Sequence, residues 1–170
     1  MFKKVFLVMV ILCSFVVLSA QVVLATDVPE DSSNVQYFYV FGADGNELYG
    51  AEDNELTLFI DLPMDETSDL IINVYDPDIS GSKDWRTDST NEWDTITEFS
   101  VYGDSLLDKK EFGADSQYNR RYFKFGPYSK SKGKKVGNNY RFKVVVKGIK
   151  GDDANLFRFN ILPASAQSFS

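Results

Sequence analysis

The stretch Tyr140-Arg141-Phe142-Lys143-Val144-Val145-Val146-Lys147 decides the fold, because apolar and charged side chains alternate along most of it. Side chains two residues apart share one face of a β-strand, so this run has one buried face and one face in water. The segment Phe157–Ile161 repeats the pattern with Phe and Ile on one face and Arg and Asn on the other. Two sheets that bury such faces against each other form a β-sandwich.

Similar apolar runs recur along the chain with turn residues between them, and the three-to-four spacing of amphipathic helices is almost absent. We therefore expect an all-β fold, an antiparallel β-sandwich of jelly-roll or C2-like type with about seven or eight strands. The expected strands are Val35–Phe41, Glu55–Leu62, Leu70–Tyr75, Thr95–Tyr102, Tyr118–Phe125, Tyr140–Lys147 and Asn155–Leu162.

Three longer connections separate these strands. Asp76–Asp94 and Gly126–Asn139 exceed the usual loop length, which is typical of functional or mobile segments. For Gly103–Gln117 the sequence leaves open a short helical turn.

The first residues predict an export signal. Lys3 and Lys4 precede the apolar run Val5–Val17, and Ala25 ends a candidate cleavage site, with a cut after Ala20 as the alternative. We therefore expect a signal peptide over 1–25, a polar lead over 26–34, one β-sandwich domain over 35–162 and a flexible tail over 163–170. The mature protein would be periplasmic or extracellular, without a transmembrane span.

Cysteine and charge limit the function classes. Cys13 is the single cysteine and lies in the signal, so the mature chain has no disulfide framework. Cleavage removes two of the 18 basic residues and none of the 25 acidic ones, which moves the net charge from −7 to −9. A nucleic-acid partner is therefore not expected, because a negatively charged protein repels the phosphate backbone.

Three acidic turns each adjoin an apolar run: Ala51–Asn54, Asp76–Gly81 and Gly151–Asn155. The chain also has no histidine. Carboxylate and amide oxygens are hard ligands suited to Ca²⁺, and the missing imidazole removes the usual zinc ligand. The pattern predicts calcium as the cofactor.

The second turn copies the opening of a calcium loop, with oxygen ligands at alternate positions and Gly81 at the sharp bend. Thr87 stands where a helix-loop-helix hand needs glutamate, so we expect a calcium loop in a β context, completed by the other turns. The alternative is that these residues only cap turns and solvate loops. The expected metal ligands are Glu52, Asp53, Asp76, Asp78, Ser80, Asp84, Asp152, Asp153 and Asn155.

Trp85 and Trp93 lie in polar surroundings within the long connection after the second turn. They can stack on a sugar ring or a partner, which would make the chain a carbohydrate-binding module. We favour the other interpretation, in which they cover the open end of the sandwich, because large aromatic side chains commonly close cores.

Four lysines, Lys130, Lys132, Lys134 and Lys135, crowd a loop of an otherwise acidic molecule. A solvated hairpin loop is the simpler interpretation. The functional one is contact with anionic envelope material, either lipid head groups or acidic polysaccharide.

Catalysis by nucleophilic triads is excluded, because the chain has no histidine and its single cysteine lies in the signal. Paired carboxylates would still permit a small glycosidase. A short sandwich with turn-like acids leaves little room for a deep cleft, so we expect a protein that is not an enzyme.

Four sequence blocks in order carry a family resemblance: Leu48–Asn54, Val74–Asp78, Trp93–Thr95 with Phe99–Gly103, and Gly151–Asn155. The chain resembles an uncharacterised β-sandwich module of bacterial envelope proteins, which is sometimes joined to an OmpA-like peptidoglycan-binding domain. The resemblance implies an exported bacterial location and a non-enzymatic module. We expect a binding or structural role in the envelope, with an envelope protein or polysaccharide as partner. No such domain follows Pro163, so we do not expect peptidoglycan anchoring.

Overall fold

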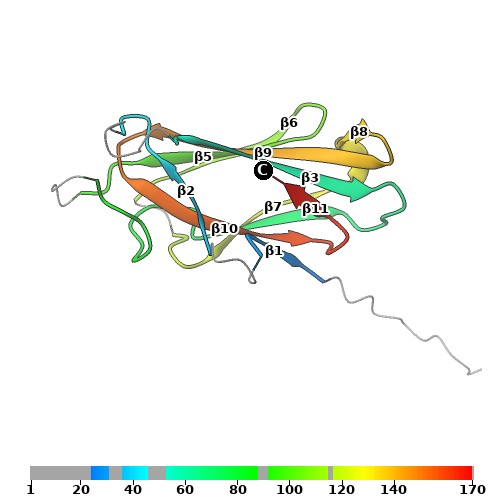
Figure 1. Cartoon of the computed structure of the whole chain (residues 1–170), viewed down its shortest axis with the longest axis horizontal. Helices are drawn as coiled ribbons and strands as arrows, with labels where there is room; N and C mark the ends of the chain where they lie inside the picture. Colours follow the sequence, from blue (N-terminus) through cyan, green and yellow to red (C-terminus); the bar gives the residue numbers. More distant parts are fainter. Residues whose placement is uncertain (1–23, 31–35, 46–52, 88–91, 115–116, 170) are drawn as a thin grey trace, which may run out of the picture.

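Two antiparallel β-sheets pack face to face in the computed structural model, which describes residues 24–30, 36–45, 53–87, 92–114 and 117–169 (Figure 1). The described residues form eleven strands and one turn of 3-10 helix, with no α-helix among them. The expected all-β sandwich is confirmed. Nearly all of the expected signal peptide, including Cys13, lies outside the described residues.

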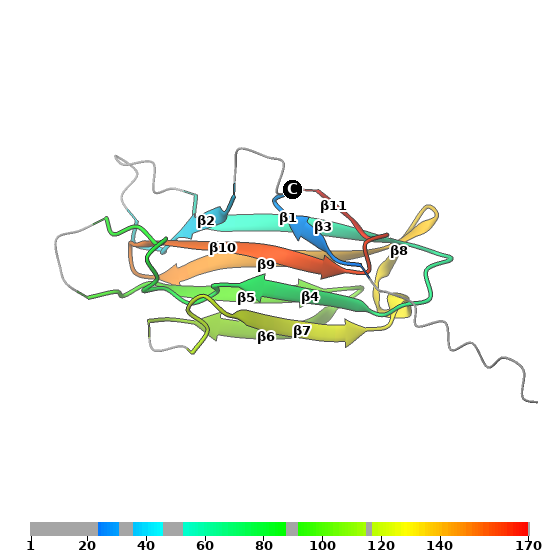
Figure 2. The ribbon, with the colours of Figure 1, turned by 90° about the horizontal axis from the view of Figure 1, so that it is seen from below.

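The first sheet has the strand order β1-β10-β4-β7, and β2 pairs with the first half of β10 (Figure 2). Its strands are β1 (Thr26–Val28), β2 (Phe38–Phe41), β4 (Leu70–Tyr75), β7 (Tyr122–Tyr128) and β10 (Ala154–Leu162).

The second sheet has the order β11-β3-β9-β5-β6, and β8 pairs with the start of β9. Its strands are β3 (Glu55–Pro63), β5 (Ile96–Tyr102), β6 (Leu106–Phe112), β8 (Lys134–Val136), β9 (Asn139–Lys150) and β11 (Gln167–Phe169). The 3-10 turn η3 (Lys130–Lys132) precedes β8.

Phenylalanines from both sheets fill the space between them. Along β9, Phe142, Val144 and Val146 are fully buried, as the alternation predicts. Each such side chain contributes about 1.5–3 kcal/mol relative to leaving it in water. The largest rings with no exposed surface or almost none are Phe99, Phe112, Phe125, Phe142, Phe157 and Phe159.

The stretch after Gly103 is a strand, β6, where the sequence left open a helical turn. The strand pairs with β5 at the sheet edge, and most of its side chains face water. Lys109 forms an ion pair with Glu98 across that pairing. An edge strand exposed on both faces shows no apolar alternation, and so its pattern is weak.

Two end segments also differ from expectation. Residues 167–169, expected in a flexible tail, form β11 and pair with β3, where the ring of Phe169 stacks on Phe59 at 5.5 Å between centroids. Residues 26–28, expected in a polar lead, form β1 and pair with β10. Strands of three residues are too short to show a period.

The connections that carry the acidic residues gather at one end of the sandwich, on the left of Figure 1. There β4 ends at Tyr75, β5 begins at Ile96, and the chain turns from β9 into β10. The described part of the chain contains no helix that is long and apolar enough to cross a membrane.

Candidate metal centre

Hydrogen bonds join the connection after β4 to the start of β10. The Asn155 side-chain amide donates to the Pro77 carbonyl oxygen at 2.7 Å. The Leu156 backbone N–H donates to Asp84 Oδ1 at 2.8 Å, and Trp85 forms a β-bridge with Ala154. The second and third acidic turns therefore lie side by side, although they are far apart in the sequence.

Asp76 and Asp78 are each 1% exposed. Asp76 adopts the left-handed backbone conformation (φ 57°), which aspartate tolerates better than most residues. Its Oδ1 accepts the Arg120 N–H at 2.7 Å, and Asp78 Oδ2 accepts the Tyr118 N–H at 2.9 Å. These bonds hold the segment before β7 against the acidic loop.

Asp84 closes its own loop. Its Oδ2 accepts the backbone N–H groups of Ser80, at 3.0 Å, and Gly81, at 2.7 Å. Burial raises the pKa of Asp84 to about 6, although its three backbone hydrogen bonds lower it. A Cβ on Gly81 would lie 3.1 Å from Asp84 Oδ2 and 3.3 Å from Asp76 Oδ2, so the glycine lets these carboxylates approach the backbone.

Three carboxylates meet beside this loop. Asp94, Asp152 and Asp153 each offer an oxygen, and these oxygens lie within 4.8 Å of one another. Asp94 is exposed and precedes β5, whereas Asp153 is 1% exposed in the turn before β10. The cluster can hold a metal ion, because an ion bound between these oxygens would offset their mutual repulsion.

Several buried oxygens in the two joined turns have no hydrogen-bond partner among the described residues. They include Asp76 Oδ2, Asp153 Oδ2 and Asn155 Oδ1. Burial raises the pKa of both Asp76 and Asp153 above the ordinary aspartate value. Each of these two carboxylates accepts a backbone N–H at its other oxygen, Asp76 from Arg120 and Asp153 from Thr87, so a proton or a cation would satisfy the oxygen that remains.

The structure brings most of the expected ligands to one end of the molecule. Asp76, Asp78, Asp84, Asp152, Asp153 and Asn155 all belong to the two joined turns. Ser80 takes part through its backbone N–H.

Asp53, from the first acidic turn, is not part of the three-carboxylate cluster, although the Gly42 N–H next to its backbone partner Phe41 donates to the Asp153 carbonyl oxygen at 3.1 Å. Asp53 is exposed, and its carbonyl oxygen accepts the Phe41 N–H. Glu52 lies outside the described residues. The set of expected ligands also missed Asp94, which the sequence marks only as an acid just before a strand.

The two tryptophans have different neighbours. Trp85 is 55% exposed and lies 5.9 Å from the ring of Tyr39, so it does not close the core as we had favoured. Trp93 is half-buried, with the Arg86 guanidinium 4.5 Å from its ring centroid.

The four lysines differ in their contacts. Lys130 donates from Nζ to the carbonyl oxygens of Met64 and Glu66, which ties η3 to the connection after β3. The other three, Lys132, Lys134 and Lys135, are exposed.

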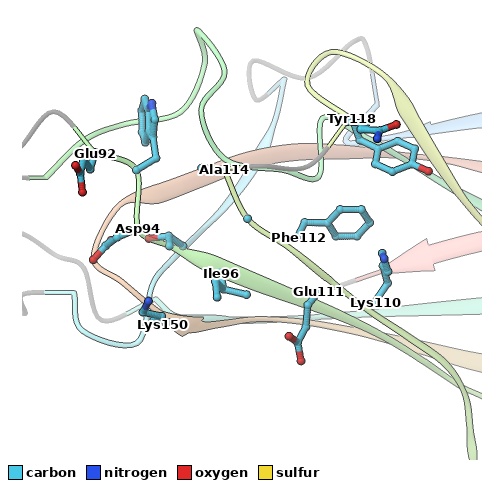
Figure 3. A pocket seen from close by; sticks show the side chains of 13 residues that line it. Glu92, Asp94, Ile96, Lys110, Glu111, Phe112, Ala114, Tyr118 and Lys150 are labelled. Atoms are coloured by element: carbon cyan, nitrogen blue, oxygen red, sulfur yellow. The ribbon is translucent and has the colours of Figure 1, made fainter.

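A hollow of about 780 Å³ adjoins the carboxylate cluster and shares Asp94 with it. Figure 3 shows Glu92, Asp94 and Lys150 at one end of this hollow and Lys110 and Tyr118 at the other. Its wall therefore carries both signs of charge next to the cluster. Comparison with family models, curated proteins and solved structures found no match to this chain.

Proposed function

We propose that the chain is an exported, non-enzymatic β-sandwich module of a bacterial envelope, and that calcium stabilises its acidic end. One observation carries the calcium assignment. Asp153 is 1% exposed, its Oδ2 has no hydrogen-bond partner among the described residues, and it belongs to the three-carboxylate cluster. A divalent cation would satisfy that oxygen and compensate the charges around it.

The ligand chemistry favours calcium over other divalent ions. The cluster offers oxygen ligands only, and the chain has no histidine that could select zinc. Calcium accepts six to eight oxygens in irregular geometry, whereas magnesium demands a near-ideal octahedron. Asp94, Asp152 and Asp153 would hold the ion. The unpartnered oxygens of Asp76, in the connection after β4, and of Asn155, in β10, lie outside this three-carboxylate cluster.

Calcium would reinforce contacts that hydrogen bonds already make here, because the Asp152 N–H donates to Asp94 Oδ1 at 3.3 Å and Thr95 Oγ1 donates to the Asp153 carbonyl oxygen at 3.0 Å. Asp94 precedes β5, and Asp152 and Asp153 precede β10, so the cluster spans the two sheets. An ion that binds only the folded state at 100 times its dissociation constant adds about 2.7 kcal/mol of stability. The site therefore supports a structural role.

Thermal unfolding and calorimetric titration test this proposal. We expect millimolar Ca²⁺ to raise the melting temperature over an EGTA sample and to release or absorb heat on binding. Asp94→Asn should weaken both effects, whereas Asp104→Asn, an exposed aspartate after β5, should leave them unchanged. Neither heat nor a higher melting temperature at millimolar Ca²⁺ would refute the calcium assignment.

The absence of enzymatic activity is a separate part of the proposal. It rests on the missing histidine and on the small size of the domain. Incubation with a panel of polysaccharides, with reducing ends as the readout, should give no product. Release of reducing sugar that Asp153→Asn abolishes would instead support a glycosidase.

A further inference from the structure

The outer face of the first sheet carries a row of hydrogen-bonding side chains that the calcium site does not use. Asp27, Asn160, Asn73 and Lys124 occupy paired positions on the neighbouring strands β1, β10, β4 and β7. Asn160 donates to Asp27 Oδ1 at 2.7 Å, and Asn73 donates to Asn160 Oδ1 at 3.2 Å. This polar row crosses the whole sheet.

A second row, two residues nearer the acidic end, is aromatic. Arg158, Tyr75 and Tyr122 occupy paired positions on β10, β4 and β7. The rings of Tyr75 and Tyr122 lie 5.1 Å apart, and the Arg158 guanidinium lies 4.9 Å from the Tyr75 ring. Tyr122 is 46% exposed, so the row presents a ring to water.

The same face continues toward the start of β10. Tyr39 on β2 pairs with Leu156, which lies two residues from Arg158 and so points to the same side of β10. The Tyr39 ring is 5.9 Å from that of Trp85, and both side chains are more than two-fifths exposed. The aromatic surface therefore extends along β10, on the sheet that faces the viewer in Figure 2.

A shallow hollow lies where the two rows meet. It measures about 350 Å³ and is lined by Asn73, Tyr122 and Asn160. That volume falls at the lower end of the range of about 300–1,000 Å³ for small-molecule sites. Its lining combines one aromatic ring with two side-chain amides, a set that offers an apolar surface beside hydrogen-bond donors and acceptors.

We propose that this outer face, defined by Tyr39, Tyr75, Tyr122, Asn73 and Asn160, binds a polysaccharide chain. The C–H faces of a sugar ring are apolar and pack on tyrosine and tryptophan rings, while the hydroxyl groups at its edge bond to amides. The strongly acidic chain speaks against nucleic acid. Paired polar side chains across four strands also differ from the apolar centre of a stable protein interface.

The face has no strong charge of its own. The negative charge of Asp27 partly offsets the positive charges of Lys124 and Arg158 on the same face. Neutral and weakly acidic glycans therefore both fit. None of these residues belongs to the carboxylate cluster. Glycan binding by this face should therefore not depend on calcium binding at the carboxylate cluster.

Electrophoresis of the purified chain through gels that contain a neutral xylan or a polygalacturonate tests the proposal, with Ca²⁺ and with EGTA. We expect at least one polysaccharide to retard the chain in both conditions. Tyr122→Ala and Asn73→Ala should each raise the apparent Kd about tenfold or more. Tyr102→Ala is the matched control, because Tyr102 lies on the outer face of the other sheet.

Three outcomes would overturn the proposal. The first is no retardation by either polysaccharide, and the second is retardation that persists in Tyr122→Ala and Asn73→Ala. The third is concentration-dependent dimerisation that Tyr122→Ala abolishes, because a second copy would then occupy the face. Melting curves of each variant separate lost binding from lost folding, and Tyr39→Ala provides a further variant away from the hollow.

Discussion

The side-chain amide of Asn155 donates to the carbonyl oxygen of Pro77 at 2.7 Å, across 78 residues of sequence. The same amide nitrogen donates to Thr97 Oγ1 at 2.9 Å. Asn155 has no exposed surface. One buried side chain therefore fixes the acidic loop, the start of β5 and the start of β10 relative to one another.

Replacement of Asn155 with alanine should lower the free energy of unfolding by about 2–4 kcal/mol, because two buried hydrogen-bonding groups lose their partner. Urea unfolding in EGTA measures the loss. Asn138→Ala, at an exposed position before β9, should stay within about 0.5 kcal/mol of the parent. A loss below 1 kcal/mol for Asn155→Ala would show that the amide does not hold the loop.

The effect of Asp153→Asn should reverse with calcium. In EGTA the variant should melt higher than the parent, because the substitution removes a buried charge whose Oδ2 has no hydrogen-bond partner. In millimolar Ca²⁺ the parent should gain stability and the variant should gain little, so the order of melting temperatures inverts. A variant that melts lower in both conditions would contradict this account.

Stability of the calcium-free protein should rise as the pH falls from 7 to about 5. Burial raises the pKa of Asp84 to about 6, so the folded state binds this proton more tightly than the unfolded state. The destabilising contribution of this group is complete above the folded pKa and disappears as pH falls toward the ordinary value near 3.8. It amounts to at most about 3 kcal/mol.

Glu66 contributes with the opposite sign at lower pH. Hydrogen bonds from Ser165 and Ser68 lower its pKa from 4.5 to about 2, so stability is lost as pH falls through that window. Melting temperature in EGTA should therefore pass through a maximum between about pH 4 and 5.5. Glu66→Gln should flatten the acid limb only, and a monotonic fall from pH 7 would refute the Asp84 contribution.

The two ion pairs between β3 and β9 should differ in strength. Arg141 donates to both oxygens of Asp61, at 2.7 and 2.8 Å, and Asp61 is 7% exposed. Arg141→Ala should cost about 2–3 kcal/mol, because it leaves a buried carboxylate without its partner. Lys147→Ala should cost less than about 0.5 kcal/mol, since Lys147 and Glu55 are half exposed. Equal losses in urea unfolding would contradict this ranking.

The sequence predicts the central strands well because their two faces differ. The expected strand Leu70–Tyr75 matches β4, and the alternation in Tyr140–Lys147 places the core face of β9 correctly. Prediction from the alternation fails where both faces of a strand meet water, as in β6, or where a strand has only three residues, as in β11.

The candidate site was also predicted only in part. Spacing alone identified Asp76, Asp78 and Asp153 as acids in turns, but it could not show which turns meet. Asp94 was missed because its role depends on β5 pairing with the end of β9, where Ile96 lies opposite Lys150, which brings Asp94 to the turn before β10. The polar row on the outer sheet face depends equally on cross-strand register, which one sequence does not reveal.

Strands β1 and β2 share one edge of β10, which limits the backbone that is open to pairing with a second molecule. The two strands pair with different halves of β10, so neither leaves a long unpaired backbone. On the other sheet, β6 meets solvent with Asp108, Lys109 and Lys110, and β11 has only three residues. Short or charged borders discourage the strand addition that seeds amyloid-like stacking. The glycan site proposed above lies on a sheet face and so would use none of these borders.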